Sequence, residues 1–380
     1  MIKCLQNFDL RQVTIKMEET NIFGMYFTMV KIRYQDYNNS LAENRVSIPT
    51  NKVNVFINIE TALNYMSTVR DLENKLLVNR KYPDELKVDI INIAAHYKEF
   101  FTSNELDTKV FLYMTDLTSD MENGFIESEI FEDFRSYYLL KYRSNPKFIS
   151  LGDKLVSEII PDVKMLCEYI PNVYFISAKN IDSGLIPYMI GKSMPDRTNF
   201  VVSGDMSDSQ YYFEPSFISH YYKRSVQRGR VLCATIEGYL KEITRSEKIS
   251  PDIVNLFSSR GIYELLLAIK GDKYRSIPPI KGLSMATIIK CILVGIKENK
   301  ITKEMENPML LSSIFPKEIQ GQLYANLMAT DIRIRTEKLL DGKKKEILSQ
   351  MVDQSDLNTL TKINQTRFER NPLTLEALLK

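Results

Sequence analysis

The segment GDKYRSIPPIKGLSMATIIKCIL, residues 271 to 293, is the most informative stretch of this chain. Its glycines permit close approach of the backbone to a ligand, and the amides at the start of a helix can receive phosphate oxygens. Cations near this turn can neutralise phosphate charge, and they are Lys270, Lys273, Arg275, Lys281 and Lys290. The segment therefore predicts a turn followed by a helix, in a basic neighbourhood that attracts phosphate groups.

The composition is that of an ordinary globular protein. The 380 residues are 44% hydrophobic, enough for one large core and a smaller helical one. With 50 basic and 48 acidic residues the net charge is +2, so nucleic-acid contacts must come from local patches. The four cysteines lack metal-binding or disulfide spacing, and no apolar run reaches the ~18 residues that span a bilayer. We expect a reducing cytoplasmic setting, without zinc and without a membrane.

Apolar strand patterns alternate with helical patterns after residue 50. The predicted strands are VNVFINI at 53–59, KVFLYM at 109–114, VYFIS at 173–177 and NFVVSGD at 199–205. Helices are predicted between them, the first across 60–77. This alternation predicts a parallel sheet with helices on its faces, and a ligand site outside the carboxyl ends of its strands. We expect three units, an N-terminal extension at 1–50, an α/β domain at 51–240 and a helical region at 241–380.

Short segments at these strand ends resemble those of the 5′-nuclease and flap-endonuclease family, a PIN-like superfamily. Asn58 stands at the position of the family's first Asp, and VFLYMTD places Asp116 at the second. The segment SAKNIDSGL has Asn180 at a Glu position and retains Asp182. In FVVSGDMSDSQ, Asp205 is retained together with Gln210, while Ser207 replaces a second Asp. Arg275 in the opening segment replaces a further acidic residue.

The resemblance covers about residues 53 to 295 and implies a PIN-like three-layer parallel sheet followed by a helix-three-turn-helix region. The segment FRSYYLLKYRSNP at 134–146 is similar to a family DNA-contact segment, although a solvated amphipathic helix explains it equally well. The DNA-binding residues that the resemblance implies are Arg135, Tyr142, Arg143, Lys273, Lys281, Gly282 and Ser284.

Family members cleave phosphodiesters with two divalent ions, which need a dense carboxylate cluster. The residual metal site would consist of Asp116, Asp182 and Asp205, because four of the seven matched acidic positions are lost, namely Asn58, Asn180, Ser207 and Arg275. Aspartates at strand ends also cap helices, so ordinary capping is the alternative role for the retained three. Our hypothesis is that Arg275 acts as an internal counterion that bridges Asp205 and Asp182.

The resulting prediction is a catalytically impaired 5′-3′ exonuclease or flap-endonuclease-like protein with a structural or non-specific DNA-binding role. Its low glycine content and abundant Asn, Lys and Ile suggest a phage-type source, and therefore the host-cell cytoplasm. No cofactor is expected, and Mg²⁺ or Mn²⁺ is required only if activity remains. Two alternatives stay open. One is an active nuclease with a rearranged metal site, and the other is a protein-interaction subunit that uses the fold as a scaffold for an unidentified partner.

Overall fold

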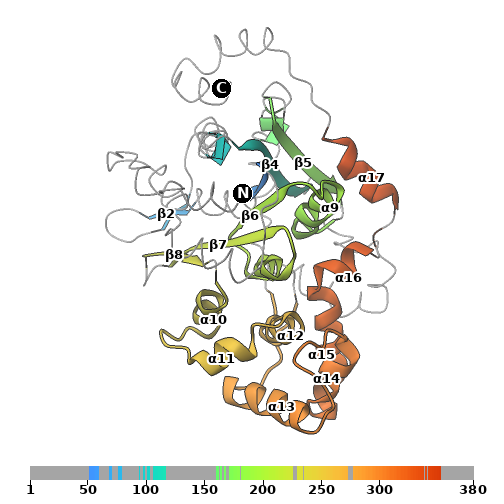
Figure 1. Cartoon of the computed structure of the whole chain (residues 1–380). Coiled ribbons are helices and arrows are strands. Elements are labelled where there is room, and N and C mark those ends of the chain that lie inside the picture. The colour runs from blue at the N-terminus through green and yellow to red at the C-terminus, as the bar shows by residue number, and fades with distance from the viewer. Residues whose placement is uncertain are drawn as a thin grey trace.

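Figure 1 shows the chain as a computed structural model. The structure describes residues 51–59, 68–70, 76–78, 94, 97–98, 101–102, 106–116, 160–161, 163–164, 167, 171–179, 181–225, 229–233, 235–272, 277–337, 339 and 341–351. Several predicted features therefore lie outside the described residues, namely the 1–50 extension, Arg135, Tyr142, Arg143, Asn180, Lys273 and Arg275. The backbone of Asp116 is described, but its side chain is not.

The centre of the molecule is a six-stranded sheet with the strand order β5-β4-β1-β6-β7-β8. The strands are β1 (Lys52–Asn58), β4 (Asp107–Asp116), β5 (Val173–Lys179), β6 (Thr198–Ser203), β7 (Phe217–Ser225) and β8 (Gly229–Cys233). Strands β5 through β7 pair in parallel, and β8 pairs antiparallel to β7. The predicted α/β class with a parallel sheet is confirmed, and all four predicted strands are present.

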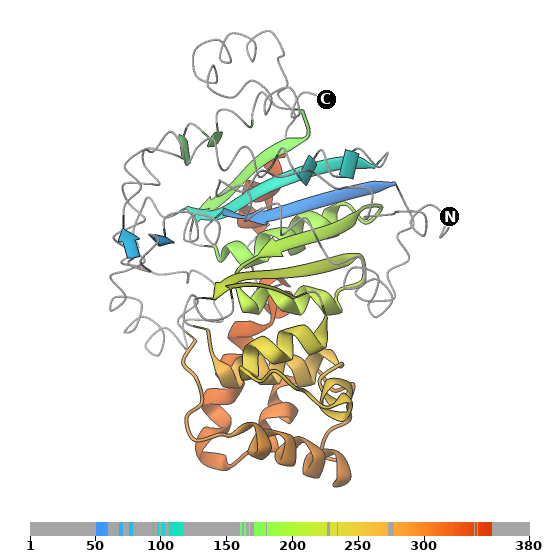
Figure 2. The same ribbon diagram turned by 90° about the vertical axis from the view of Figure 1, so that its left-hand side faces the viewer.

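Alternate residues of a strand point to opposite faces of the sheet, and in the central strands β1 and β6 both sets are buried. Both faces of the sheet are therefore covered. On one face Phe56, Phe111 and Tyr174 stack across three strands, with ring centroids 4.9 Å apart in each pair. This face also packs against α9 (Ile186–Ser193) and α17 (Asp341–Ser349). On the other face Phe200 contacts the rings of helical residues Tyr97 and Phe101. The architecture therefore has three layers (Figure 2).

Two parts of the sequence prediction differ from the structure. The segment predicted as a helix across 60–77 contains β2 (Thr68–Arg70), which pairs antiparallel with β3 (Leu76–Val78). The β-branched Thr68 and Val69 favour strand pairing, which explains this correction. Strands β7 and β8 were not predicted, because FISHYYKRS and GRVLC mix polar and apolar residues without a clear period.

Helices follow the sheet and build a second core, which lies below it in Figure 1. They are α10 (Ile236–Thr244), α11 (Pro251–Leu256), α12 (Arg260–Lys270), α13 (Met285–Lys297), α14 (Pro308–Ser313), α15 (Lys317–Thr330) and α16 (Ile332–Glu337). The predicted boundary between residues 240 and 241 falls inside α10, so the division into domains stays a prediction. None of the helices in the described part of the chain is both long and apolar enough to cross a membrane.

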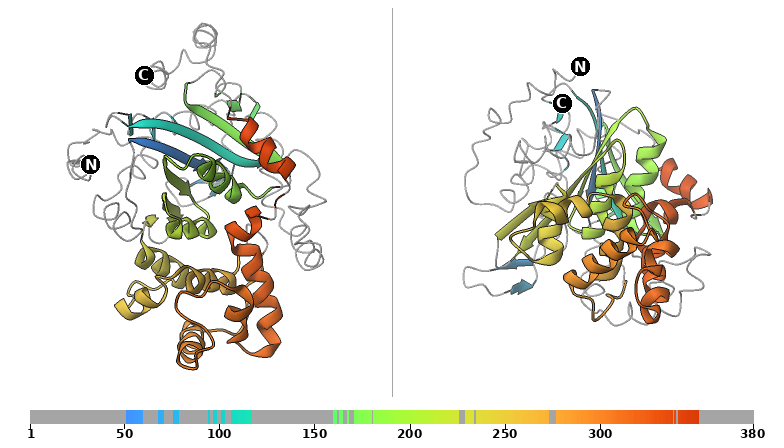
Figure 3. Two further views of the ribbon diagram at one scale, coloured as in Figure 1. Left: turned by 45° about the vertical axis from the view of Figure 1, so that its right-hand side comes forward. Right: turned by 60° about the horizontal axis from the view of Figure 1, so that its bottom comes forward.

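The chain returns to the sheet after the helical core (Figure 3). Ile332 of α16 and Ile347 of α17 are fully buried in the same cluster as Phe56 of β1. Gln350, just after α17, holds the β5 backbone, because its side chain donates to the Ser177 carbonyl at 2.7 Å and accepts from the Ser177 amide at 3.0 Å. This return brings α16 to the carboxyl edge of the sheet, where the candidate site lies.

Candidate functional site at the carboxyl edge of the sheet

The predicted site residues follow the carboxyl ends of neighbouring parallel strands. Asn58 is the last residue of β1, Asp116 is the last of β4, and Asp205 comes two residues after β6. Asp182 comes three residues after β5. Because parallel strands end at the same edge, the topology places these residues on one side of the molecule. The side chains of Asn58, Asp182 and Asp205 are all buried there.

Asp182 is engaged by two described partners. Its Oδ1 accepts a hydrogen bond of 2.8 Å from the amide of Gly184 and caps the 3-10 helix η1 (Ser183–Leu185). Its Oδ2 accepts a 2.5 Å hydrogen bond from Nη1 of Arg335 in α16. The side chains are 6% and 8% exposed, so this is a buried ion pair. Asp182 thus has the capping role that we weighed as an alternative, together with an arginine counterion that the sequence prediction missed.

Asp205 also caps a helix. Its Oδ1 accepts from the amide of Ser207 at 2.9 Å, at the start of η2 (Met206–Phe213). The hydroxyl of Ser207 in turn donates to Oδ2 of Asp272, the second residue of the opening segment. Asp272 is buried, and its carboxylate brings the helical region into contact with Ser207 at the start of η2. Its place in the Gly-Asp pair was the only sequence signal for it.

The described donors do not fit a two-metal centre. Among the residues the structure describes, no group of three His, Cys, Asp or Glu side chains is arranged to hold a metal ion. Two divalent ions bring four positive charges, whereas Asn58 and Ser207 are neutral and Arg335 adds a positive charge beside Asp182. The proposed bridging by Arg275 is untested, because that residue lies outside the described ranges, but the described counterion of Asp182 is Arg335.

The described residues 271–272 and 277–284 of the opening segment lie between α12 and α13. Gly271 has a φ of +68°, and an added Cβ would lie 2.5 Å from the carbonyl oxygen of Ile277, so this position needs glycine. The backbones of Asp272 and Ile277 exchange two hydrogen bonds of 2.9 and 2.8 Å. The Ile280 amide donates to the carbonyl of Ile269 at 2.8 Å. The turn is therefore fixed to the end of α12.

Three predicted DNA-binding residues gather at the exposed N-terminus of α13. Ser284 caps this helix by accepting a 3.1 Å hydrogen bond from the Thr287 amide. Gly282 has a φ of +83°, and the space where its Cβ would stand is open. Lys281 beside it is exposed. The arrangement places a cation, an open backbone and helix amides next to one another at the start of α13.

Gln210 connects η2 to the junction of α15 and α16. Its Nε2 donates to the carbonyls of Ser207 and Thr330 at 2.7 and 3.0 Å, and its Oε1 accepts from the Ile332 amide at 2.9 Å. The Thr330 carbonyl at the end of α15 and the Ile332 amide at the start of α16 are groups that a helix itself leaves without a partner. The match at Gln210 therefore marks a residue that holds α16, and with it Arg335, against the site.

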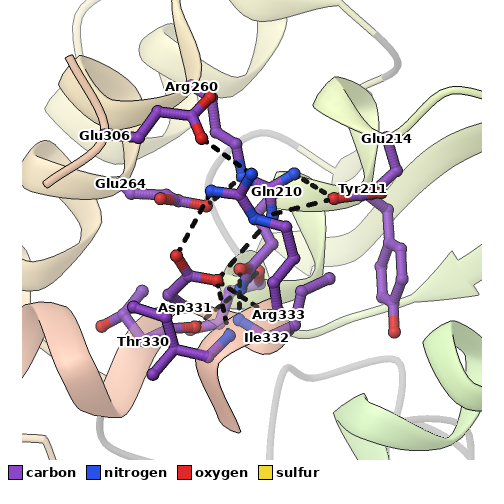
Figure 4. A network of polar contacts seen from close by, with 12 residues as sticks. Gln210, Tyr211, Glu214, Arg260, Glu264, Glu306, Thr330, Asp331, Ile332 and Arg333 are labelled. Carbon is purple, nitrogen blue, oxygen red and sulfur yellow. Dashed lines mark hydrogen bonds and ion pairs between the residues drawn. The ribbon is translucent and has the colours of Figure 1, made fainter. Parts of the chain in front are cut away.

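A network of buried charges joins the same elements (Figure 4). Arg260 of α12 pairs with Glu214 and Glu264, the latter at 2.7 Å, and lies 3.9 Å from Asp331. Burial raises the pKa of Glu264 to about 8, although the nearby guanidinium of Arg260 opposes this rise.

Arg333 of α16 extends the network with ion pairs to Glu306 at 2.7 Å, Asp331 at 3.4 Å and Glu214 at 3.9 Å. Burial disfavours the charged form of Arg333, but Asp331 and other carboxylates overcome it and raise its pKa. Sequence reasoning missed this network, because its members are dispersed along the chain; the Arg260–Glu264 spacing of four residues in α12 was the only local signal.

Comparisons with known proteins gave similarities at the level of structure. No family model matches the sequence, and no curated protein sequence matches it. The catalytic core of Rad2 in complex with a DNA substrate is similar at a TM-score of 0.38 and 13% identity, covering 86% of this chain and 93% of that chain. Human GEN1 in complex with Holliday junction DNA is similar at a TM-score of 0.39 and 14% identity, covering 89% of this chain and 72% of that chain.

At TM-scores below 0.5, any activity or DNA binding of this chain has to be argued from its own residues.

Proposed function

We propose that this chain is a catalytically impaired 5′-nuclease-like protein that binds the phosphate backbone of duplex DNA. The turn between α12 and α13 would be the helix-three-turn-helix that makes this contact. The observation that carries the proposal is the buried ion pair between Arg335 and Asp182 at the carboxyl edge of the sheet. It supports loss of catalysis, because the carboxylate that a metal ion would need is held by a guanidinium.

Electrostatics explain why this pair opposes metal binding. The guanidinium of Arg335 places a positive charge directly beside the carboxylate of Asp182. A divalent ion bound to Asp182 would stand close to the guanidinium, and each unit of like charge at ~4 Å costs about 4 kcal/mol at an effective dielectric constant of ~20. The neutral Asn58 and Ser207 do not offset this repulsion. Cation binding should therefore be weak.

The DNA-binding part of the proposal is supported by the exposed start of α13. Amides at the N-terminus of a helix attract phosphate groups, and the exposed Lys281 adds a positive charge. When such a lysine binds a phosphate, counterions are released from the DNA. Lys270 at the end of α12 and Lys290 in α13 are also exposed. Contacts of this kind position a duplex without reading its sequence. Binding should therefore be non-specific and sensitive to salt.

A labelled 5′-flap duplex, incubated with the full chain in Mg²⁺ and in Mn²⁺, tests both parts. We expect salt-sensitive retention of the duplex without cleavage. Lys281→Ala should weaken retention and lower the salt slope by about one, whereas Lys345→Ala, an exposed lysine on α17, should change neither. Structure-dependent cleavage that Asp205→Ala abolishes would instead establish the alternative, an active nuclease with a rearranged metal site. Absence of any duplex retention would refute the DNA-binding role.

A further inference from the structure

Seven charged side chains form one network between the helical core and the sheet. Ion pairs in the described part of the chain join Lys192, Glu214, Arg260, Glu264, Glu306, Asp331 and Arg333. Three of the carboxylates, those of Glu214, Glu264 and Asp331, are at most 4% exposed. Buried charges are costly unless partners compensate them, so the balance of charge decides how firmly the network holds these elements together.

With every group ionised, the network carries one negative charge in excess. Its four carboxylates meet three cations, and one of these cations, Lys192, is half exposed to solvent. The imbalance persists in the interior, where the three buried carboxylates share the guanidiniums of Arg260 and Arg333. One bound proton would remove the excess charge.

Two of the three buried carboxylates have ample compensation. Glu214 pairs with both Arg260 and Lys192. Asp331 accepts hydrogen bonds of 2.8 and 3.3 Å from two amides at the start of α16, whose positive dipole end also favours a carboxylate. Neither group is therefore the one that the excess proton would choose.

Glu264 on α12 is the remaining buried carboxyl group. Within the described residues its hydrogen-bond donor is Nε of Arg260, at 2.7 Å (Figure 4). The charged groups that act on Glu264 are Arg260 of the same helix, Asp331 before α16 and Arg333 in α16. Burial raises the pKa of Glu264 to about 8, although the Arg260 guanidinium opposes this rise. Glu264 is thus the group that would hold the proton.

The contact between α12 and the start of α16 is only partly closed. Nη2 of Arg260 lies 3.9 Å from Oδ1 of Asp331, and Nε of Arg333 lies 3.9 Å from Oε1 of Glu214. Both distances are too long for a hydrogen bond, and both nitrogen atoms are buried without such a partner among the described residues. A buried network with unmade hydrogen bonds is less stable than a satisfied one. We therefore expect this contact to open more readily than the surrounding core.

We propose that Glu264 is the proton-binding group of a latch between α12 and the start of α16. With the proton bound, the network is neutral and the contact stays closed. When Glu264 loses the proton, its negative charge needs hydration, and the contact loosens to admit water. The closed contact binds the proton more tightly than an opened, hydrated Glu264 does. Rising pH should therefore favour opening from about pH 4.5 upward, with the full effect reached at about pH 8.

The latch bears on the candidate site because α16 carries both Arg333 and Arg335. This helix has six residues, Ile332–Glu337, so its start cannot move far without its later residues. Loosening the start of α16 would weaken the hold of Arg335 on Asp182. This consequence rests on the proposed function, in which Arg335 keeps a cation away from Asp182, whereas the latch itself depends on the network alone.

Hydrogen exchange of the full chain between pH 5.5 and pH 8, read by mass spectrometry, tests the latch. Protection of α16, corrected for the intrinsic exchange rate, should fall at least about tenfold over this range, because each pH unit shifts the opening equilibrium by up to about tenfold. Low concentrations of urea should leave this exchange unchanged, since a local opening exposes little surface. Exchange of β4 should instead increase with urea, because it requires unfolding of the whole molecule.

Two variants assign the effect to Glu264. Glu264→Gln keeps the shape of the side chain but has no proton to lose, so protection of α16 should stay nearly constant with pH. Glu237→Gln is the matched control, because it removes a carboxylate that pairs with Lys241 at the surface of α10. This control should keep the fall of the parent chain. The parent chain tests the inference even if Glu264→Gln does not fold.

Three results would overturn the inference. Constant protection of α16 in the parent chain would show that no proton acts on this contact. An equal fall in Glu264→Gln would show that another group binds the proton. Protection of α16 as high as that of β4, with the same urea dependence, would show that α16 opens only when the whole molecule unfolds. None of these readouts involves DNA or cleavage, so failure of the latch and failure of the proposed function can be distinguished.

Discussion

Replacing Arg335 with glutamine should destabilise the protein and create affinity for divalent cations. The ion pair with Asp182 is 2.5 Å long and lies in a buried setting. Removing one partner of such a pair costs about 3–5 kcal/mol, because a charge stays buried without compensation. The hydrogen bond from the Gly184 amide to Asp182 remains in the variant, so we expect the lower end of this range. The vacated volume beside the carboxylate would then admit a cation.

Urea unfolding followed by circular dichroism measures the first effect, and titration calorimetry with Mn²⁺ measures the second. A loss of about 3 kcal/mol corresponds to a midpoint lowered by about 1 M urea. The matched control is Lys241→Gln, which removes an exposed pair with Glu237 at 2.6 Å and should cost less than ~0.5 kcal/mol. The Asp182→Asn/Arg335→Gln double variant removes both charges and should recover much of the stability that the single variant loses.

The reasoning would be wrong if Arg335→Gln were as stable as the parent chain, because the pair would then not compensate a buried charge. It would also be wrong if the parent chain bound Mn²⁺ as tightly as the variant. In that case the guanidinium would not oppose a cation at Asp182. An additive double variant, with no recovery of stability, would show that the two side chains act independently.

Three further substitutions test the elements that hold the site. The pKa of Glu264 is raised from 4.5 to about 8, so the folded state binds the Glu264 proton more tightly than the unfolded state does. The free energy of unfolding should therefore fall as pH rises between these two values. In Glu264→Gln, urea denaturation across the same pH range should show a smaller fall. Gln210→Ala removes three hydrogen bonds to buried backbone groups and should cost about 2 kcal/mol or more in urea unfolding; an unchanged midpoint would contradict the role of Gln210. Gly271→Ala should lower the thermal stability more than Gly282→Ala, because only the Cβ added at position 271 meets a carbonyl oxygen, that of Ile277. Equal losses would show that the positive φ, and not this contact, causes the destabilisation.

Much of the sheet could be predicted from local sequence. Parallel strands buried on both faces appear as continuous apolar runs, and VFLYM in β4 is such a run. Strand β7 escaped prediction because His, Lys and Arg interrupt its aromatic residues, so that neither a continuous run nor a strict alternation remains. The pair β2 and β3 escaped prediction because three-residue strands are shorter than the window that reveals a period.

The candidate site was predictable only in part. Asp182 and Asp205 could be located because strand ends are readable, and their capping roles follow from the preference of aspartate for helix starts. The partners could not be located in this way. Ser207 and Asp272 are 65 residues apart, and their contact depends on how the turn after α12 packs against η2. The sequence prediction named an arginine counterion but assigned the role to Arg275.

The sequence by itself determined four strands of the sheet and the residues that follow them, because these are local patterns. Only the tertiary structure decided which cation neutralises Asp182. Arg335 is 153 residues away, and it arrives because the chain passes through the helical core and returns in α16 to the sheet. Gln210 and the charge network of Arg260 and Arg333 hold this return in place. Contacts between such distant segments arise from packing, which no local period of the sequence records.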